Sequence, residues 1–204
     1  MKLGPKYKIA RRLGAPIFEK TQTQKFKLSS ETKKGPGAKR GGMMKTDFGR
    51  QMIEKQKARF TYGISEKQFS KYVKNAIESK SHAPTNDVFV SLETRLDNVV
   101  ARLAIVSTRR HARQIVSHGH ILVNGRKVTV PSYVVRAGDK ISVREGSKST
   151  AIFKDFEAKI KEIQTPLWLT WDTEKKVASV LKMPAIEGQD LLFDLGAVIE
   201  FYKR

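Results

Sequence analysis

Apolar residues recur at helical spacing through the middle of the chain. Between residues 69 and 77 they lie three or four positions apart, on one face of a helix: Phe69, Tyr72, Val73, Ala76 and Ile77. Ser65 precedes this stripe, and Gln68 stands three residues after Ser65, which is the spacing of a capping box. The pattern therefore predicts an amphipathic helix that begins after Ser65.

The same spacing predicts two neighbouring helices. One begins near Asp47 and carries Met52, Ile53, Gln56 and Phe60. The other opens at Asn86 or Asp87 and keeps one apolar stripe as far as Leu103, made by Phe89, Leu92, Leu96, Val99, Val100 and Leu103. We expect these stripes to form core and give them no other role.

A shorter helix with a basic start follows. Ser107 or Thr108 is its expected N-cap, and Gly119 its expected end. Its first turns carry three arginines, Arg109, Arg110 and Arg113. Unpaired backbone N–H groups and the positive end of the helix dipole lie at the same place. A single arginine there would suggest a solvated face, whereas three indicate a site for more than one phosphate.

Turn residues and alternation predict a small antiparallel sheet after this helix. Asn124-Gly125 joins two short apolar runs, and this dipeptide favours the type I′ turn of a hairpin because both central residues need positive φ. A second turn is expected at residues 137–139. Residues 140–144 alternate, with Ile141 and Val143 facing inward.

The two ends of the chain are less periodic. Thr150 is expected to cap a helix that ends at Pro166, and residues 167–171, 177–181 and 198–202 read as short strands. Residues 1–46 are rich in Gly, Pro and Lys without a sustained period, so order is expected to begin near Asp47. This segment is either a disordered basic tail or an arm that becomes ordered against nucleic acid.

Charge narrows the class of partner. Lys and Arg number 40 against 20 for Asp and Glu, which gives a net charge of +20 and a pI near 10.2. The excess is concentrated in residues 1–164, and residues 165–204 are close to neutral. Such an excess indicates a polyanionic partner, with nucleic acid first and an anionic membrane second. No apolar run approaches the ~18 residues of a membrane span, so no membrane partner is expected.

The sequence offers no reaction centre. There are no cysteines, which removes disulfides, thiolate metal sites and cysteine nucleophiles. Of the four histidines only His118 and His120 are close in sequence, and no third ligand accompanies them, so no metal and no cofactor are expected. Asp97 is close in sequence to Arg95 and Arg102, and its expected task is to orient an arginine. We expect no enzyme.

Three segments of the central region resemble the small RNA-binding module named after ribosomal protein four of the small subunit. They read R-L-D-N-V-V-A-R-L from residue 95, T-R-R-H-A-R-Q-I-V-S-H-G from residue 108 and I-L-V-N-G-R-K-V from residue 121. The flanks resemble the bacterial-type ribosomal protein four family as well: L-G-P-K-Y-K-I-A-R-R from residue 3, G-R-Q-M-I-E-K-Q-K-A-R-F-T-Y-G-I-S-E-K-Q-F from residue 49, P-L-W-L-T-W-D from residue 166 and V-I-E-F-Y-K-R from residue 198. The resemblance covers nearly the whole chain.

The resemblance implies a structural constituent of the small ribosomal subunit. Members bind 16S-type ribosomal RNA directly, at a helix junction of the 5′ domain, and nucleate subunit assembly by phosphate and shape recognition. The implied neighbours are ribosomal proteins five and three, with messenger RNA where it enters the subunit. The expected location is the cytoplasmic ribosome, and an organellar ribosome stays open.

The resemblance and the pattern together give an α+β fold with three parts. These are a basic arm at 1–46, a helical domain at 47–92 with residues 150–204 packed against it, and the RNA-binding module at 93–149, an α-L-type unit of two helices beside a short antiparallel sheet. Many members hold zinc with cysteines in the arm, whereas this chain has none. We therefore expect RNA contacts and packing to hold the arm.

The candidate RNA-binding residues are basic or polar. Carried over to this sequence, those of the module are Arg95, Thr108, Arg109, Arg110, Arg113, His118 and Asn124. Those of the arm and the first helix are Lys8, Arg11, Arg12, Lys39, Arg40, Lys45, Arg50, Lys55, Lys57 and Arg59. Gly-Gly-Met-Met stands at 41–44 where the family often has arginines, so any grip on messenger RNA rests on Lys39, Arg40 and Lys45.

Two other functions use the same module. One is an RNA-modifying enzyme, which would need a catalytic domain of roughly 150 residues beside it; only sixty residues follow Arg144. The other is a free-standing factor that rescues stalled large subunits, which would have no use for both flanks.

Overall fold

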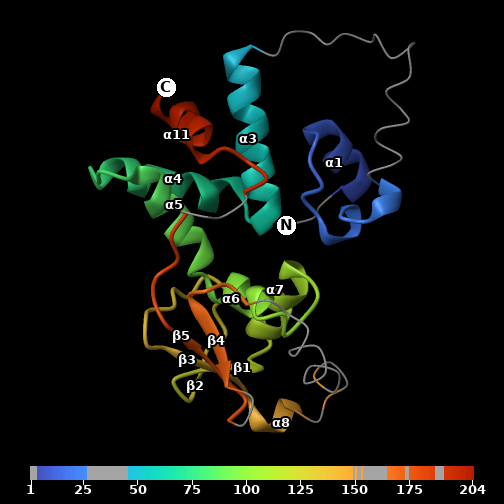
Figure 1. The fold of residues 1–204 in the computed structure, drawn as a ribbon, viewed down its shortest axis with the longest axis vertical. Coiled ribbons are helices and arrows are strands. Elements are labelled where there is room, and N and C mark those ends of the chain that lie inside the picture. The colour runs from blue at the N-terminus through green and yellow to red at the C-terminus, as the bar shows by residue number, and fades with distance from the viewer. Residues whose placement is uncertain are drawn as a thin grey trace. The chain divides into compact units, whose positions relative to one another are not determined.

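The fold is described from a computed structural model of the 204-residue chain. It covers residues 4–26, 46–148, 150, 153, 165–172, 175–186 and 191–204. The chain divides into two compact units (Figure 1). The first unit comprises residues 1–88 and 188–204, and the second unit comprises residues 89–187.

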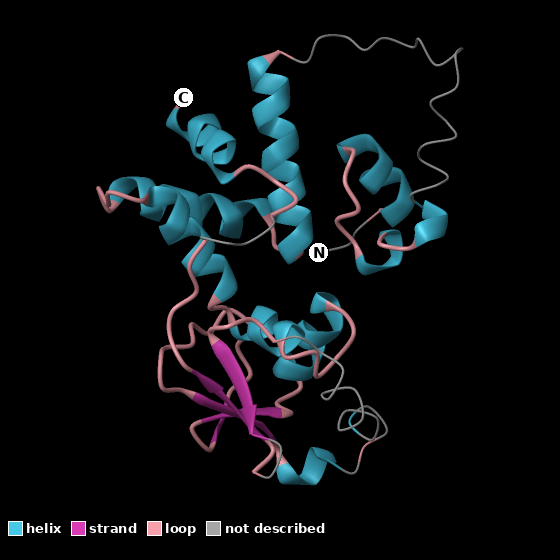
Figure 2. Ribbon diagram, viewed as in Figure 1, coloured by secondary structure: helices cyan, strands magenta, loops and turns pink. Residues whose placement is uncertain are grey.

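Three helices form the centre of the first unit. They are α3 (Asp47–Tyr62), α4 (Glu66–Glu78) and α11 (Leu195–Lys203), and α11 packs on α3 and α4 (Figure 2). Ser65 caps α4, because its hydroxyl accepts a hydrogen bond from the N–H of Gln68, as the capping spacing predicted. Edge-on and tilted ring contacts, Tyr62 with Phe193 and Phe69 with Tyr202, join α11 and the chain before it to α3 and α4.

The arm has a small core of its own in this unit. Helix α1 (Lys6–Leu13) and the 3₁₀ turn η1 (Glu19–Thr21) enclose six buried residues: Ala10, Leu13, Ala15, Ile17, Phe18 and Phe26. The prediction that order begins near Asp47 is therefore wrong. These apolar residues have no helical or strand period, because turns at Gly14 and beyond bring them together. Lys39, Arg40 and Lys45 lie outside the described residues.

The predicted helix from residue 86 to residue 103 is two helices. They are α5 (Pro84–Glu93) and α6 (Leu96–Arg102), and Arg95 between them is extended, with φ −64° and ψ 134°. The N–H of Leu96 donates to the carbonyl of Tyr133 at 2.8 Å, and the N–H of Val135 donates to that of Thr94 at 2.9 Å. Pairing with a distant loop breaks the helix, although the apolar period continues through the break.

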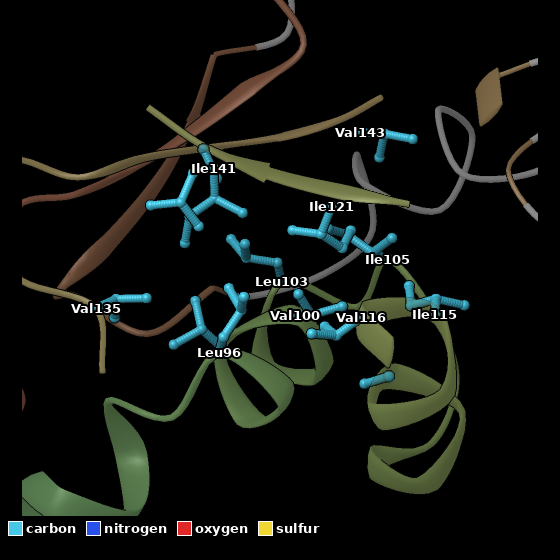
Figure 3. Close-up of a cluster of buried hydrophobic side chains, with 14 of the residues drawn as sticks. Leu96, Val100, Leu103, Ile105, Ile115, Val116, Ile121, Val135, Ile141 and Val143 are labelled. Atoms are coloured by element: carbon cyan, nitrogen blue, oxygen red, sulfur yellow. The ribbon is translucent and has the colours of Figure 1, made fainter. Parts of the chain in front are cut away.

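The second unit is a five-stranded antiparallel sheet with α6 and α7 (Arg109–Ser117) beside it. The strand order is β2-β1-β3-β5-β4, with β1 Ile121–Val123, β2 Arg126–Lys127, β3 Lys140–Val143, β4 Leu169–Asp172 and β5 Val177–Val180. Figure 3 shows side chains of α6, α7, β1 and β3 meeting between the helices and the sheet. Alternate residues of β1 and β3 face this core, and for β3 the sequence predicted it.

Of the two expectations for residues 150–204, packing against the helical domain holds, among the described elements, only for α11, and the strand at 198–202 is wrong. Strands β4 and β5 join the module, since Ile141 of β3 pairs with Ala178 of β5, and Trp168 lies in the core of the second unit. Strand β5 covers an edge of β3 that would otherwise expose unpaired backbone groups, and β4 pairs with β5. Residues 198–202, expected as a strand, belong to α11, which Asp194 caps by accepting from the N–H of Gly196 at 2.7 Å.

The remaining C-terminal elements fit the expected class. Short helix α8 (Glu145–Lys148) follows β3, and most of the helix predicted from Thr150 to Pro166 lies outside the described residues. The α+β class, with two helices beside an antiparallel sheet, is confirmed.

Candidate nucleic-acid interface

The basic start of α7 is built as the sequence predicted. Thr108 is its N-cap: the hydroxyl accepts from the N–H of His111 at 3.1 Å. The first turn contains no acidic residue. The backbone N–H groups of the first turn and the side chains of Arg109, Arg110 and Arg113 therefore create a positive potential at one place.

A buried carboxylate, Asp97, fixes two of the candidate arginines. Arg95 donates from Nε to Oδ1 at 3.0 Å and from Nη2 to Oδ2 at 2.7 Å. Arg113 donates from Nε to the same Oδ2 at 2.8 Å, and its Nη2 is 2.7 Å from that oxygen. Asp97 is 3 % exposed, while the Arg113 side chain is 30 % exposed. Asp97 thus orients arginines as expected, although its partners are Arg95 and Arg113 and not Arg102.

A second buried carboxylate, Glu93, was not expected from the sequence. Arg102 donates to both of its oxygens, from Nε at 3.0 Å and from Nη2 at 2.7 Å. The Nδ2 of Asn98 donates to the same carboxylate at 2.8 Å, and the Oδ1 of Asn98 accepts from the Nε of Arg109 at 2.8 Å. Arg102 joins the site for this reason. Because the helix breaks at Arg95, Glu93 and Arg102 are not on one continuous helix, and the spacing of residues along the chain does not show that they meet.

The two carboxylates make a rigid surface that is still positive. The site contains two carboxylates, Glu93 and Asp97, and four guanidinium groups, those of Arg95, Arg102, Arg109 and Arg113. The positive charges therefore outnumber the negative ones. Paired contacts to a carboxylate fix the guanidinium planes of Arg95, Arg102 and Arg113, and one bond to Asn98 orients that of Arg109. Planar forks suit phosphate oxygens. Arg110 is exposed and has no hydrogen bond or ion pair with the described part of the chain. Side chains fixed in advance lose less conformational freedom when a ligand binds.

Two candidate residues are enclosed, which contradicts direct contact with RNA. The Arg95 side chain is 3 % exposed, so its guanidinium reaches only the protein and acts through Asp97. The Lys55 ammonium lies 2.8 Å from a Glu66 oxygen and 4.3 Å from the centre of the Phe201 ring, and its side chain is 10 % exposed. Basic residues at helical spacing look alike in sequence, and only packing separates the buried ones.

The Glu66 carboxylate interacts with Lys55 and with the polar and charged groups around it. Burial alone would raise the pKa of Glu66, but hydrogen bonds from Lys55 and Tyr202 and the charge of Arg59 outweigh it, so the pKa lies below its ordinary value. Burial and the Glu66 carboxylate raise the pKa of Tyr202. This cluster stabilises the contact between α3, α4 and α11, which is a structural role.

Asn124 has a structural task in the hairpin. It has φ 50° and Gly125 has φ 77°, which confirms the predicted turn. The Asn124 Nδ2 donates to Asp139 Oδ1 at 2.8 Å, and its Oδ1 accepts from the N–H of Lys140 at 2.9 Å. Both polar atoms of the side chain therefore hold the hairpin to the next turn.

A second group of basic side chains surrounds the end of α7. His118 is exposed, and its ring centre is 6.1 Å from that of His120. The Nδ1 of His120 is 2.9 Å from the hydroxyl of Ser147. Burial lowers the pKa of His120, and the positive charges of His118, Arg144 and Lys127 lower it further. A positive potential therefore exists at both ends of α7.

The basic residues of the first unit are mostly at the surface. Lys8, Arg11 and Arg12 of α1 are exposed. On α3, Arg50 is exposed and pairs with Asp47 at 3.0 Å, whereas Lys57 pairs with Glu54 at 2.7 Å and is half-buried. Arg59 is half-buried and donates to Gln56 at 2.7 Å.

The described residues offer little for a metal site or a membrane span. Within them, no three His, Asp or Glu side chains come together as ligands for a metal ion. None of the described helices has the length and apolar character that crossing a membrane requires.

The class of protein follows from two family models that meet at the break between α5 and α6. Residues 2–93 match the model described as ribosomal protein S4/S9 N-terminal domain, and residues 94–141 match the S4 domain. The second match spans α6, α7 and the hairpin, so the basic helix start lies on an RNA-binding module of the S4 type.

Curated relatives match over almost the full length. The small ribosomal subunit proteins uS4 of Halothermothrix orenii and of a Roseiflexus species are each 40 % identical to this chain, over 98 % of both chains. The uS4 protein of Levilactobacillus brevis is 37 % identical, also over 98 % of both chains. The chain belongs to the uS4 family of small ribosomal subunit proteins, as the resemblance predicted, and ribosomal RNA binding is implied by that membership.

Proposed function

We propose that this chain binds 16S-type ribosomal RNA directly, at a helix junction of the 5′ domain, and nucleates assembly of the small subunit. The observation that supports this most is the set of arginines fixed by Glu93 and Asp97 beside the start of α7. Its contact residues are Arg102, Arg109, Arg110 and Arg113, with His118 at the other end of α7. Thr108 holds the helix start, and Arg95 and Asn124 support the surface without touching RNA.

Phosphate contacts supply most of the affinity in this proposal. A net charge of +20 attracts a polyanion, and each neutralised phosphate releases counterions, so binding weakens as salt rises. The guanidinium groups sit at fixed positions, so they match the phosphate positions of a folded junction better than a base sequence. The exposed Lys8, Arg11, Arg12 and Arg50 add contacts from the first unit, together with the half-buried Lys57 and Arg59.

The proposal also covers where the chain acts, which molecules lie next to it and whether it is an enzyme. The chain acts in the cytoplasmic ribosome as a non-enzymatic constituent, with ribosomal proteins five and three as neighbours and messenger RNA near Lys39, Arg40 and Lys45. Membership of a ribosomal protein family supports the non-enzymatic role. Sedimentation tests the setting: the protein is expected with small subunits, and sedimentation with large subunits would favour a rescue factor instead.

Filter binding to naked 16S-type RNA in rising potassium chloride tests the RNA contact. Changing Arg109, Arg110 and Arg113 together to Ala should weaken binding by more than about tenfold and reduce the slope of log affinity against log salt by about 3. The control changes Lys67, Lys71 and Lys74 to Ala, which removes the same charge from exposed positions of α4. A wild-type affinity that does not respond to salt, or equal losses in both variants, would contradict the proposal.

A further inference from the structure

The arm contains a hollow that is a second candidate site. It is distinct from the arginine surface of the second unit, which consists of Arg102, Arg109, Arg110 and Arg113. Five residues line its volume of about 320 Å³: Tyr7, Arg11, Thr23, Lys25 and Phe26. Two of them are aromatic, two are cationic, one is a threonine and none has a carboxylate side chain. The hollow therefore combines a flat apolar surface with positive charge.

The exposed Tyr7 ring of the hollow packs against the buried Phe26 ring. Phe26 is 8 % exposed and belongs to the small core of the arm. The Tyr7 ring lies against it, with 5.8 Å between the ring centres and 39° between the planes, yet Tyr7 is 47 % exposed. One side of the Tyr7 side chain is thus fixed by Phe26, while much of its surface is open to solvent.

The cations stand beside this aromatic pair. Tyr7 and Arg11 are four residues apart on α1 and so share a face of the helix. The Arg11 guanidinium carbon is 5.9 Å from the centre of the Phe26 ring, and Lys25 is exposed next to Phe26. In the described part of the chain, no carboxylate forms an ion pair with Arg11 or Lys25. Both remain available to an anion.

These features suit one kind of ligand better than others. Proteins bind single-stranded RNA by stacking unpaired bases on aromatic or guanidinium planes and by holding the backbone with cations. A double helix has no free base face to offer, and an acidic peptide would use the cations without the ring. An unpaired nucleotide uses both.

We propose that this hollow binds one unstacked nucleotide of RNA, with the base on Tyr7 and the adjoining phosphate between Arg11 and Lys25. The inference rests on the proposed function, because it takes ribosomal RNA as the partner. It adds that the arm contacts a single-stranded position, whereas the second unit contacts phosphates of a folded junction.

Affinity measurements on the full chain separate stacking from charge. Tyr7→Ala leaves the charge unchanged and should weaken binding to 16S-type RNA by about tenfold, since one stacked base contributes about 5-fold to about 150-fold, while the salt slope stays the same. Tyr7→Phe keeps the ring and should bind within about twofold of wild type. Lys25→Ala should weaken binding and reduce the slope by about 1. The matched control is Tyr133→Ala, which removes an exposed tyrosine of the second unit and should have no effect.

Ultraviolet crosslinking followed by mass spectrometry locates the contact. The expected result is a nucleotide attached to Tyr7 or Phe26, retained in Tyr7→Phe and competed by a ten-residue uridine oligonucleotide at far lower concentration than by uridine monophosphate. Crosslinking does not depend on Tyr7→Ala being folded. A protein crosslink at this hollow in place of RNA, or equal competition by the mononucleotide, would overturn the inference.

The inference and the proposed function fail in different ways. If wild-type protein binds the RNA, but Tyr7→Ala binds equally well and no crosslink reaches the hollow, only the inference is lost. If wild-type protein does not bind the RNA at all, the proposed function is lost as well.

Discussion

Single buried residues determine how the arginine surface is arranged. Glu93 and Asp97 carry no exposed charge, yet each holds guanidinium groups that reach the surface. Burying such pairs costs desolvation, so their value lies in geometry more than in net stability. Removing one partner is nevertheless expensive, because the other is left without its hydrogen bonds.

Glu93→Gln should lower the free energy of unfolding of the second unit by about 2–3 kcal/mol, at the low end for a broken buried pair because Arg102 remains partly solvated. Urea unfolding followed by tryptophan emission measures this directly, since Trp168 and Trp171 both lie in the second unit. Glu145→Gln is the control at an exposed position and should change the value by less than about 0.5 kcal/mol. A Glu93→Gln effect as small as that of the control would show that Arg102 needs no fixed partner.

His120 should make the second unit sensitive to acid. Because burial and three neighbouring cations lower its pKa, the unfolded chain binds a proton there more readily than the folded chain does. Stability from this residue is present above the ordinary histidine value of 6.5 and is lost as pH falls through the lowered value. The melting temperature reported by tryptophan should drop over that range, and His120→Asn should flatten the profile.

His82→Asn is the comparison for this profile, because His82 is exposed in the first unit and its replacement should leave the tryptophan-detected profile unchanged. A profile that keeps its full slope in His120→Asn would assign the acid sensitivity to another group.

At the scale of elements, the end of α7 and the hairpin that follows are locally determined. Gly119 has φ +74°, and the N–H of His120 donates to the carbonyl of Ile115 while that of Gly119 donates to Val116, which is a Schellman ending. A Cβ at Gly119 would stand 2.1 Å from the Lys127 Cε. The stem of Lys127 therefore crosses the helix end and connects α7 to β2.

Gly119→Ala should destabilise the second unit by about 1–2 kcal/mol, because the left-handed conformation is costly for a residue with a Cβ. Adding Lys127→Ala removes the close contact and should restore only part of the loss, since the backbone strain remains. Urea unfolding gives both values. Gly146→Ala in α8 is the control: its φ is ordinary, its Cβ would meet nothing closer than 3.6 Å, and the change should be neutral or slightly stabilising.

Local and distant interactions also explain which elements the sequence could predict. Caps at Ser65 and Thr108, the turn at Asn124 and the alternation in β3 depend on residues a few positions apart, and all were predicted correctly. The pairing of β5 with β3 and the grip of Glu93 on Arg102 depend on which distant segments meet, and neither was predicted. The sequence predicts a strand at residues 198–202 of α11 because five residues are too few to tell the apolar period of a helix from that of a strand.

At the scale of the whole molecule, charge and stability are arranged in two units with separate cores. The second unit has its own core between the sheet and α6 and α7, so it does not need the first unit to bury its apolar residues. The basic excess is distributed over both units. RNA binding should therefore depend on both, whereas folding of the second unit should depend on its own residues.

Residues 84–187 produced alone, with α5 kept whole, should unfold in one cooperative urea transition whose midpoint is close to that of the intact chain by tryptophan emission. Their affinity for 16S-type RNA should be weaker than that of the intact chain by more than about tenfold, because each lost phosphate contact lowers affinity and salt slope together. Affinity equal to that of the intact chain would remove the arm from the interface, and a broad, non-cooperative transition would show that the second unit needs the first.

The order in which the segments join the fold has a consequence for synthesis. One edge of β3 stays uncovered until residues 177–180 have been synthesised and pair with it. The apolar faces of α3 and α4 stay uncovered until residues 193–203 have been synthesised and pack on them. While the chain is being made, helices of the first unit leave the peptide exit tunnel more than a hundred residues before the segment that covers them. A nascent chain whose first 150 residues have left the tunnel thus exposes one sheet edge and one apolar helix face at once, which is the situation in which chaperones are needed most.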